Sequence, residues 1–509
     1  MYLTQCLHRG ARSHPEAIAT IDGDRIRTWR AWHADIARFG GALRALGVQD
    51  GDRVAMLSRN SADFVDYIFG TIWAGGAINP VNVRWTPREI AYSLSNCATR
   101  VLFVDPAFVG KLDEIRSLAP GLEHVLIVGS DEWQEWLASA TPVEDAGRSG
   151  DDLAAVMYTG GTTGFPKGVM LSHRNLVSAA LGVIACPEGR TSDSFIHTAP
   201  LFHVGALAGL LMAAICGSTS IFVPAFEPLA VLAEIEKRRA TEIFLVPTMM
   251  RMLIDHPEFS RFDLSSLRRI RYGASPIDLA LMDRLLSLFP SMQFSQAYGM
   301  TELGPTATSL NPEDHCGTAR TDGRMRSAGR ATATTEVRIV GQDDQELPIG
   351  EVGEIVCRGE NVMLGYWGMP EATAEATRNG WMHTGDLGRM DASGYVTVVD
   401  RLKDMIVTGG ENVYSAEVEN ALATHPSVAM VAVIALPDPQ WGEKVHAVIV
   451  PRDGCEILAG ELDAHARQIL AGYKVPRSFS FVEALPLSAA GKILKHVLRA
   501  EAGKEIVGA

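Results

Sequence analysis

The 509-residue chain has few cysteines and no long hydrophobic run. Its seven cysteines are scattered, with neither metal-ligand spacing nor a disulfide framework, so we expect reduced thiols in a cytoplasmic protein. The longest apolar run, residues 204–217, is shorter than the ~20 residues that cross a bilayer, and it predicts a buried helix. The segment 1–12 has no apolar core, so we expect neither a signal peptide nor a transmembrane segment.

Excess positive charge is also absent. The net charge of −14 argues against a general binder of nucleic acid or of anionic membranes. The length predicts two or more domains. Strand-like and helical segments alternate from residue 28 to residue 104, including a capping box that begins at Thr86 with Pro87 at the first helical position. This alternation predicts an α/β fold with a largely parallel sheet.

The most informative stretch is a glycine- and threonine-rich loop that runs from Tyr158 to Gly168 and lies between two predicted strands. Such a loop can bring backbone N–H groups close to an anion, and Lys167 adds a positive charge at its end. A plain glycine turn is the alternative interpretation. The loop of P-loop NTPases is excluded because Pro166 precedes the lysine and Gly168 follows it.

This loop resembles the phosphate-binding signature of the acyl-adenylate-forming superfamily, which includes acyl-CoA synthetases, firefly luciferases and adenylation domains of peptide synthetases. It departs from that signature once, at Gly160, where serine is typical. The resemblance spans about residues 28–499, with the motifs in family order. It implies an N-terminal domain (1–400) of α/β subdomains with a small β-barrel-like part. A small mobile α+β C-terminal domain (401–509) follows, with a hinge near Lys403.

The resemblance implies that ATP, CoA and Mg²⁺ are the cofactors, and it places the nucleotide on several motifs. The implied ATP-binding residues are Thr159, Gly160, Gly161, Thr162, Thr163, Gly164, Lys167, Gly273, Ala274, Ser275, Ala297, Tyr298, Gly299, Thr301, Asp386, Arg401 and Lys492. Tyr298 would stack on adenine, Thr301 would donate to the α-phosphate, and Asp386 would accept the ribose hydroxyls. Taken alone, Thr301 and Glu302 would mark a helix start, and Asp386 would be a turn residue.

Catalysis is expected from three side chains. Glu302 would hold Mg²⁺, because this hard cation prefers carboxylate oxygen. Thr301 would contact the reacting phosphate, and Lys492 would bridge the substrate carboxylate and the α-phosphate. For the thioester step, the resemblance implies that Gly409 and Gly410 line the CoA tunnel. Trp441 packs either on pantetheine or on its own loop.

The stretch from Pro200 to Gly205 resembles the part of acyl-CoA synthetases that lines the acyl pocket, so His203, Val204 and Gly205 are the implied pocket residues. Without the resemblance, His203 would be a core or cap residue. Gly205 and Gly209 would leave a groove along a helix or allow close helix packing. No acidic residue lies between His197 and Phe226, and a buried ammonium would need a carboxylate partner. The substrate is therefore expected to be a carboxylic acid with an apolar tail.

The sequence thus predicts an AMP-forming acid–CoA ligase, with medium- or long-chain fatty acids favoured and aryl acids as the alternative. A stand-alone ligase that loads a carrier protein, an adenylate-forming oxygenase and a non-catalytic nucleotide sensor are the rival hypotheses. The exact acid is not given by the sequence. Neither is the oligomeric state, and a homodimer stays open.

Overall fold

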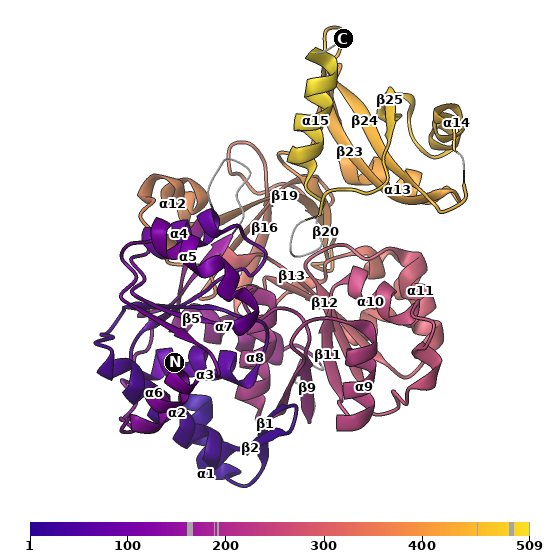
Figure 1. The fold of residues 1–509 in the computed structure, drawn as a ribbon. Helices are drawn as coiled ribbons and strands as arrows, with labels where there is room; N and C mark the ends of the chain where they lie inside the picture. Colours follow the sequence, from indigo (N-terminus) through magenta and orange to yellow (C-terminus); the bar gives the residue numbers. More distant parts are fainter. Residues whose placement is uncertain (160–165, 188, 191–192, 456, 488–492, 508–509) are drawn as a thin grey trace. The chain divides into compact units, whose positions relative to one another are not determined.

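The computed structural model describes every residue except 160–165, 188, 191–192, 456, 488–492 and 508–509 (Figure 1). The chain divides into two compact units. The larger unit is Met1–Val337 with Cys357–Met382, and the smaller unit is Arg338–Val356 with His383–Ala509. The predicted α/β class with a large N-terminal and a small C-terminal part is confirmed. The predicted domain boundary after residue 400 falls within the smaller unit and stays a prediction.

A nine-stranded sheet organises one half of the larger unit, in the order β15-β14-β13-β12-β11-β9-β10-β1-β2. Strands β1, β10, β9, β11, β12 and β13 pair in parallel, and β2, β14 and β15 pair antiparallel. Their bounds are β1 Ile18–Asp22, β2 Arg25–Thr28, β9 Ser194–His197, β10 Thr219–Phe222, β11 Glu242–Leu245, β12 Arg269–Gly273, β13 Gln293–Tyr298, β14 Thr308–Leu310 and β15 Arg330–Ala331.

Helices cover both faces of this sheet. Helices α9 (Pro228–Arg238), α10 (Pro247–Ile254) and α11 (Leu279–Leu288) share a buried aliphatic core with one face. On the other face lies α8 (Val204–Cys216), beside α7 (His173–Ile184). As predicted, the apolar run that begins at Val204 is a helix, and it is mostly buried and capped by Gly217 in the left-handed conformation.

The second sheet of the larger unit has seven strands in the order β18-β8-β7-β4-β3-β5-β6. Its strands are β3 Arg53–Leu57, β4 Ala77–Pro80, β5 Val101–Val104, β6 His124–Ile127, β7 Leu153–Thr159, β8 Lys167–Ser172 and β18 Gly365–Tyr366. Strands β6, β5, β3, β4 and β7 are parallel, whereas β8 and β18 add antiparallel pairs. The helices of this region are α1 Gln5–Ser13, α2 Trp29–Ala45, α3 Ala62–Trp73, α4 Pro87–Asn96, α5 Leu112–Leu118, α6 Asp131–Ser139 and α12 Pro370–Ala376.

Both faces of the second sheet are buried as well. Helices α4 and α5 pack on the face that carries Leu102 and Val104. On the opposite face, Phe103 meets aromatic rings from three helices, namely Phe39 of α2, Tyr67 of α3 and Trp133 of α6. The capping box predicted at Thr86 is present, with both of its hydrogen bonds. The sheet is therefore the middle layer of an α/β/α sandwich.

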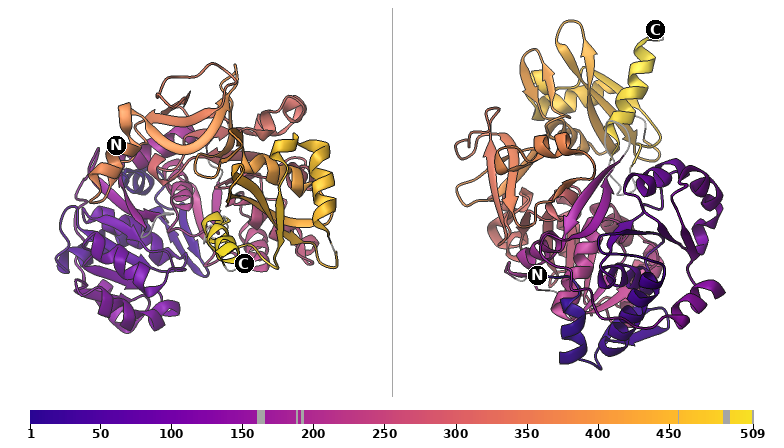
Figure 2. Two further views of the ribbon diagram at one scale, coloured as in Figure 1. Left: turned by 90° about the horizontal axis from the view of Figure 1, so that it is seen from above. Right: turned by 90° about the vertical axis from the view of Figure 1, so that its left-hand side faces the viewer.

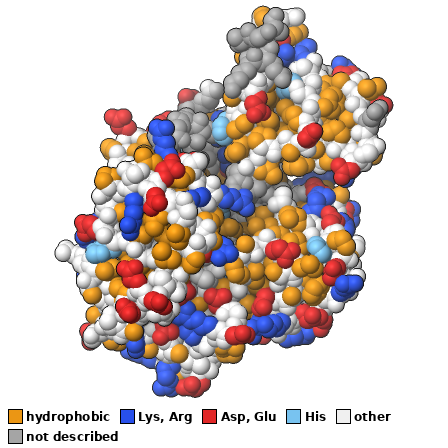
Figure 3. Space-filling model, viewed as in Figure 1, with side chains coloured by type: hydrophobic (Ala, Val, Ile, Leu, Met, Phe, Trp, Pro, Cys, Tyr) orange, Lys and Arg blue, Asp and Glu red, His pale blue; other side chains and the backbone are white. Residues whose placement is uncertain are grey.

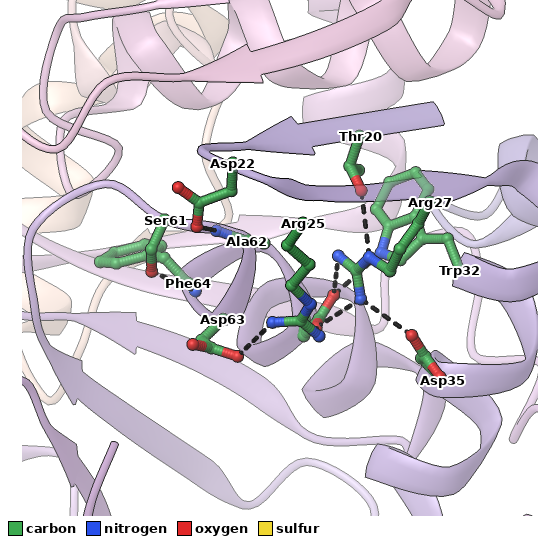
Figure 4. A network of polar contacts seen from close by, with 11 residues as sticks. Thr20, Asp22, Arg25, Arg27, Trp32, Asp35, Ser61, Ala62, Asp63 and Phe64 are labelled. Atoms are coloured by element: carbon green, nitrogen blue, oxygen red, sulfur yellow. Dashed lines mark hydrogen bonds and ion pairs between the residues drawn. The ribbon is translucent and has the colours of Figure 1, made fainter. Parts of the chain in front are cut away.

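A buried ion network ties β2 to α2 and α3 (Figure 4). The Arg27 guanidinium donates two hydrogen bonds to the Asp66 carboxylate, at 2.7 and 2.9 Å. The indole N–H of Trp32 donates to the same carboxylate at 3.0 Å. Arg27 and Asp66 are only 6% and 4% exposed. Because both groups are almost fully buried, their charges depend on these partners, to which Asp35 adds a contact with Arg27 and Arg25 adds one with Asp66, both at 3.1 Å.

We expect Asp66→Ala to destabilise the larger unit by about 3–5 kcal/mol, because it leaves the Arg27 charge buried without its main partner. Urea denaturation followed by circular dichroism measures this loss. The matched control is Glu258→Ala, which removes an exposed pair with Arg261 whose side chains are 43% and 72% accessible, and its cost should stay below about 1 kcal/mol. Equal stability of the two variants would contradict the structural role of Asp66.

The smaller unit is built on a long antiparallel pair, β23 (Val428–Asp438) and β24 (Gly442–Pro451). Strands β21 (Ile406–Thr408), β22 (Glu411–Val413) and β25 (Ser478–Phe481) extend this sheet. Helices α13 (Ser415–Ala423) and α14 (Ala459–Ile469) pack on one face, and α15 (Lys495–Val507) packs on the other (Figures 1 and 2). A four-stranded sheet of β16 (Thr335–Val340), β17 (Gly353–Gly359), β19 (Met382–Met390) and β20 (Val396–Arg401) contains the points where the units divide.

The surface is charged but mixed. Figure 3 shows acidic and basic side chains interspersed over the visible face of the larger unit. Among the described residues, no helix combines the length and the hydrophobicity that crossing a membrane requires.

Candidate active site

The glycine-rich loop connects the two strands of an antiparallel hairpin. Strands β7 and β8 pair so that Thr159 stands opposite Lys167, at the two ends of the loop. The predicted ATP-binding residues Gly160, Gly161, Thr162, Thr163 and Gly164 lie outside the described residues. Ser172, at the end of β8, caps α7 through a capping box with Asn175. The hairpin therefore fixes where the loop begins and ends, with a lysine at its exit.

Three further predicted motifs end or follow parallel strands of the nine-stranded sheet, namely β12, its neighbour β13, and β9, which β11 separates from β12. Gly273 ends β12, Tyr298 ends β13, and His203 follows β9 at the start of α8. Since these strands run in parallel, their carboxyl ends share one edge of the sheet, where α/β proteins bind ligands. We call residues 273–275 and 297–299, which are predicted to bind the nucleotide, the nucleotide wall. The sheet thus brings the nucleotide wall together with the residues predicted for the acyl pocket.

Close contact between two backbones explains why residue 273 of the nucleotide wall is a glycine. Gly273 pairs with Ala297 across β12 and β13, and a Cβ on Gly273 would lie 2.4 Å from the carbonyl oxygen of Ala297. The next residue, Ala274, is exposed and has a left-handed φ of 67°. A non-glycine residue in this conformation costs free energy and is typical of functional loops. Ser275, after it, is partly exposed.

A buried hydrogen-bonded chain supports this wall from behind. His315 Nδ1 lies 2.9 Å from the carbonyl oxygen of Asn311, which can only accept, so Nδ1 carries the proton. Nε2 therefore accepts from the Tyr272 hydroxyl at 2.8 Å. Burial lowers the pKa of His315 to about 4, so the ring is neutral at neutral pH. Tyr272 directly precedes Gly273, so the hydrogen bonds of Tyr272 and His315 fix the position of the nucleotide wall at Gly273.

We expect the stability of the larger unit to fall as the pH drops from about 6.5 toward 4, because the unfolded chain binds a proton at His315 that the folded chain excludes. Between pH 7 and pH 5 this one ring should contribute about 2 kcal/mol of lost stability. His315→Gln keeps an amide donor and acceptor but does not titrate. Urea denaturation at both pH values should therefore show a smaller loss for the variant, and an identical loss would contradict a neutral buried ring.

The predicted metal ligand and the loop lysine meet at a residue that the sequence analysis missed, Tyr366 of β18. The Tyr366 hydroxyl donates to Glu302 Oε1 at 2.9 Å. Lys167 Nζ lies 4.8 Å from the centroid of the same ring, a cation–π contact. Burial and the Glu302 carboxylate raise the pKa of Tyr366, so its hydroxyl stays protonated and donates. Thr301 precedes Glu302 in a short 3₁₀ helix, η3 (Thr301–Leu303).

The pocket residues lie at the junction of the two sheets of the larger unit. His203 caps α8 through its backbone, and its ring is 4.5 Å from that of Phe202. Asn60, which follows β3, holds the loop that precedes His203. The Asn60 amide donates to the carbonyl of Ala199 and accepts from the N–H of Leu201, both at 2.9 Å. Asn60 has no distinctive signal in the sequence, since an Asn after a strand usually marks a turn.

A small cavity lies beside α8, lined by side chains that include Phe195, Thr198, Ala206 and Phe244. The two helix glycines differ in their surroundings. A Cβ on Gly209 would lie 3.2 Å from the Phe195 ring, so Gly209 serves close packing of the helix on β9. A Cβ on Gly205 would lie 3.9 Å from Phe244, so this glycine leaves space next to the cavity.

The smaller unit holds the remaining predicted residues. Asp386 and Arg401 stand opposite each other on β19 and β20, with 3.4 Å between Oδ1 and Nε. Lys403 is exposed in the turn that follows β20. Lys492, the predicted catalytic lysine, lies outside the described residues.

The predicted CoA-tunnel glycines form the turn of the β21–β22 hairpin. Gly409 and Gly410 have φ of 61° and 84°, which a two-residue hairpin turn requires. Trp441 packs against this turn: its carbonyl accepts from Gly409 N–H at 2.9 Å, and a Cβ on Gly409 would be 2.8 Å from its ring. Arg477 lies 4.4 Å from the centroid of the Trp441 ring. Of the two alternatives for Trp441, loop anchoring is the one these contacts support.

Comparisons with known proteins identify the family of the chain. The family of AMP-binding enzymes matches residues 7–367, and the AMP-binding enzyme C-terminal domain matches residues 417–492. A feruloyl-CoA synthase of Amycolatopsis sp is 41% identical over 97% of this chain and 98% of the relative. The long-chain-fatty-acid–CoA ligase FadD13 of Mycobacterium tuberculosis is 37% identical over 93% of this chain and 92% of the relative. The anthranilate CoA ligase AuaEII, solved with anthranoyl-AMP, has a TM-score of 0.89 and 29% identity, covering 99% of this chain and 97% of that one.

The fold and the motifs define an adenylate-forming enzyme. The chain belongs to the AMP-binding enzyme family, the acyl-adenylate-forming superfamily indicated by its glycine loop. Within that family it is an ATP-dependent acid–CoA ligase.

Proposed function

We propose that this ligase first joins an apolar-tailed carboxylic acid to AMP and then transfers the acyl group to CoA, with Mg²⁺ as the metal. The observation that carries the proposal is the meeting of Lys167 and Glu302 at Tyr366, beside the glycine hairpin. The carboxyl ends of β9, β12 and β13 add the motifs that follow those strands. One site then contains groups for phosphate, for a cation and for an apolar acid.

The first step needs this concentration of charge. The substrate carboxylate and the ATP phosphates are negative, and two unit charges 4 Å apart repel by about 4 kcal/mol at an effective dielectric of 20. Lys167, the loop N–H groups and Lys492 would offset that repulsion as the carboxylate attacks the α-phosphorus and pyrophosphate leaves. Thr301 would donate to the α-phosphate, and Tyr298 would stack on the adenine.

The chemistry of the residues present fits a magnesium ion. Glu302 is a buried carboxylate that accepts a hydrogen bond from the Tyr366 hydroxyl, and carboxylate oxygen is the ligand type that this hard cation prefers. When bound, Mg²⁺ would neutralise phosphate charge. Glu302 would hold it, while Lys167 contacts the face of the Tyr366 ring.

The second step calls for access by a thiol. The CoA sulfur would attack the acyl carbonyl, and AMP would leave as a stable phosphate. Lys492 would obstruct that approach, so we propose that the C-terminal part rotates about Lys403 and presents the Gly409–Gly410 turn instead. The β21–β22 hairpin suits this role, because the space above Gly410 is open while Trp441 packs on Gly409 and holds the turn in place. Asp386 and Arg401 would hold the ribose.

A medium- or long-chain fatty acid is the first candidate for the substrate, because the pocket stretch is apolar and lacks acidic residues. An aryl acid is the second candidate. Similarity to a feruloyl-CoA synthase supports the same alternative.

A screen of pyrophosphate release across linear, branched and aryl acids tests the substrate. Fatty acids of moderate length should give the highest kcat/KM, and preference for an aryl acid would support the second candidate. Thioester formation with CoA against a carrier protein tests the acceptor. Thioester on the carrier alone would reject CoA as the acceptor, and no release with any acid would reject the proposed reaction.

A further inference from the structure

Residues 361–367, which we call the bridging segment, connect the Glu302 turn to the β7–β8 hairpin by main-chain hydrogen bonds. At one end, the N–H of Met363 donates to the Glu302 carbonyl at 2.9 Å. At the other end, the N–H of Trp367 donates to the Gly168 carbonyl at 2.7 Å. The segment thus spans from the nine-stranded sheet to the seven-stranded sheet within the larger unit.

The side chain of Asn361 strengthens the first connection. Its amide donates to the carbonyls of Leu303 and Thr306, at 2.9 and 3.1 Å, and Asn361 is fully buried. In the second connection, the N–H of Leu364 donates to the Met170 carbonyl, and Tyr366 pairs with Val169 on β8. Both ends are therefore fixed to the elements that carry the two charged groups.

Tyr366 is the residue of this segment that contacts both charges. It is 7% exposed, its hydroxyl donates to Glu302, and its ring face receives Lys167. These contacts use different parts of one side chain, the hydroxyl for the anion and the π-face for the cation. A buried phenol in contact with both groups fixes where the carboxylate and the ammonium lie.

We propose that Tyr366 is a positioning residue that holds the Glu302 carboxylate and the Lys167 ammonium apart and oriented for metal-bound ATP. This inference rests on the proposed function, because it takes Glu302 as the metal-holding group. It assigns the hydroxyl to the metal-dependent part of ATP binding and the ring to the metal-independent part. The two parts are separable by substitution.

Two variants at this position test the assignment. Tyr366→Phe keeps the ring and removes the hydroxyl, whereas Tyr366→Leu removes both. ATP binding is measured by isothermal titration calorimetry, with Mg²⁺ and with a chelator. Since a hydrogen bond to a charged group contributes about 1.5 kcal/mol or more, Tyr366→Phe should weaken binding at least about tenfold with Mg²⁺. Without Mg²⁺, its binding should stay within about twofold, and Tyr366→Leu should weaken binding in both conditions.

The matched control is Tyr67→Phe, which removes a buried hydroxyl that donates to the Val54 carbonyl at 2.9 Å, on α3 rather than near Glu302. It should leave both affinities unchanged. Equal binding by Tyr366→Phe and the unaltered protein with Mg²⁺ would overturn the role of Tyr366, and so would an equal loss with and without the metal. Failure of the unaltered protein to bind ATP would instead reject the proposed function, and this inference with it.

Discussion

Lys492→Ala should lower the rate of acyl-AMP formation by about 100- to 1000-fold, the loss typical of removing one group that stabilises developing charge. The substrate carboxylate and the α-phosphate repel each other, and this lysine is the group proposed to lie between them. Thioester formation from acyl-AMP supplied in advance should stay within about tenfold, because that step has a phosphate as leaving group and needs little added charge. Single-turnover assays of the two half-reactions measure both values.

An equal loss in both half-reactions would contradict the proposed role of Lys492. Lys495→Ala is a suitable control, because Lys495 contacts Ser415 and Glu419 within the smaller unit. It should cost stability while leaving the ratio of the two half-reactions unchanged. A changed ratio in that control would mean that the substitution at Lys492 acts through the fold of the smaller unit.

Gly273→Ala should reduce kcat/KM for ATP by about 100-fold, the scale expected when reacting groups are misplaced by about 1 Å. The added methyl group would lie 2.4 Å from the backbone oxygen of Ala297, so β12 and β13 must move apart. Both strands end in residues of the proposed nucleotide wall. Steady-state kinetics with varied ATP, together with ATP binding by calorimetry, measure the effect.

The control for this change is Gly110→Ala, because a Cβ at Gly110 would meet no atom within 4 Å and its φ is not left-handed. It should leave the kinetics unchanged. Normal kinetics in Gly273→Ala would contradict the close approach of the strands. A raised KM for the acid, with an unchanged KM for ATP, would assign Gly273 to the acyl pocket instead of the nucleotide wall.

Much of the fold could be predicted from local patterns. The strand at Arg53–Leu57, the capping box at Thr86 and the buried helix that begins at Val204 are found where hydrophobic period and capping residues indicated them. These features depend on neighbouring residues in sequence. The order of strands in the two sheets depends on long-range pairing, such as β9 beside β10 and β11, and no local pattern contains it.

The candidate site, too, was predicted only in part: its motifs could be recognised, but its isolated polar residues could not. Motifs with several matching residues could be recognised, and the structure brings those that follow β9, β12 and β13 to one sheet edge. Tyr366 and Asn60 could not be found, because their roles come from partners 64 and 141 residues away in sequence. His315 was missed for the same reason, since Tyr272 lies 43 residues away. The role of a single polar residue depends on such distant partners, so the neighbouring sequence does not reveal it.

The most direct test of the central claim is acid-dependent exchange of labelled pyrophosphate into ATP, measured without CoA. The claim is that the carboxylic acid and ATP react reversibly on this protein before any thiol takes part. It predicts exchange that requires the acid and Mg²⁺, with thioester appearing only after CoA is added. Exchange that is absent without CoA, in a protein that still forms thioester, would contradict an acyl-AMP intermediate.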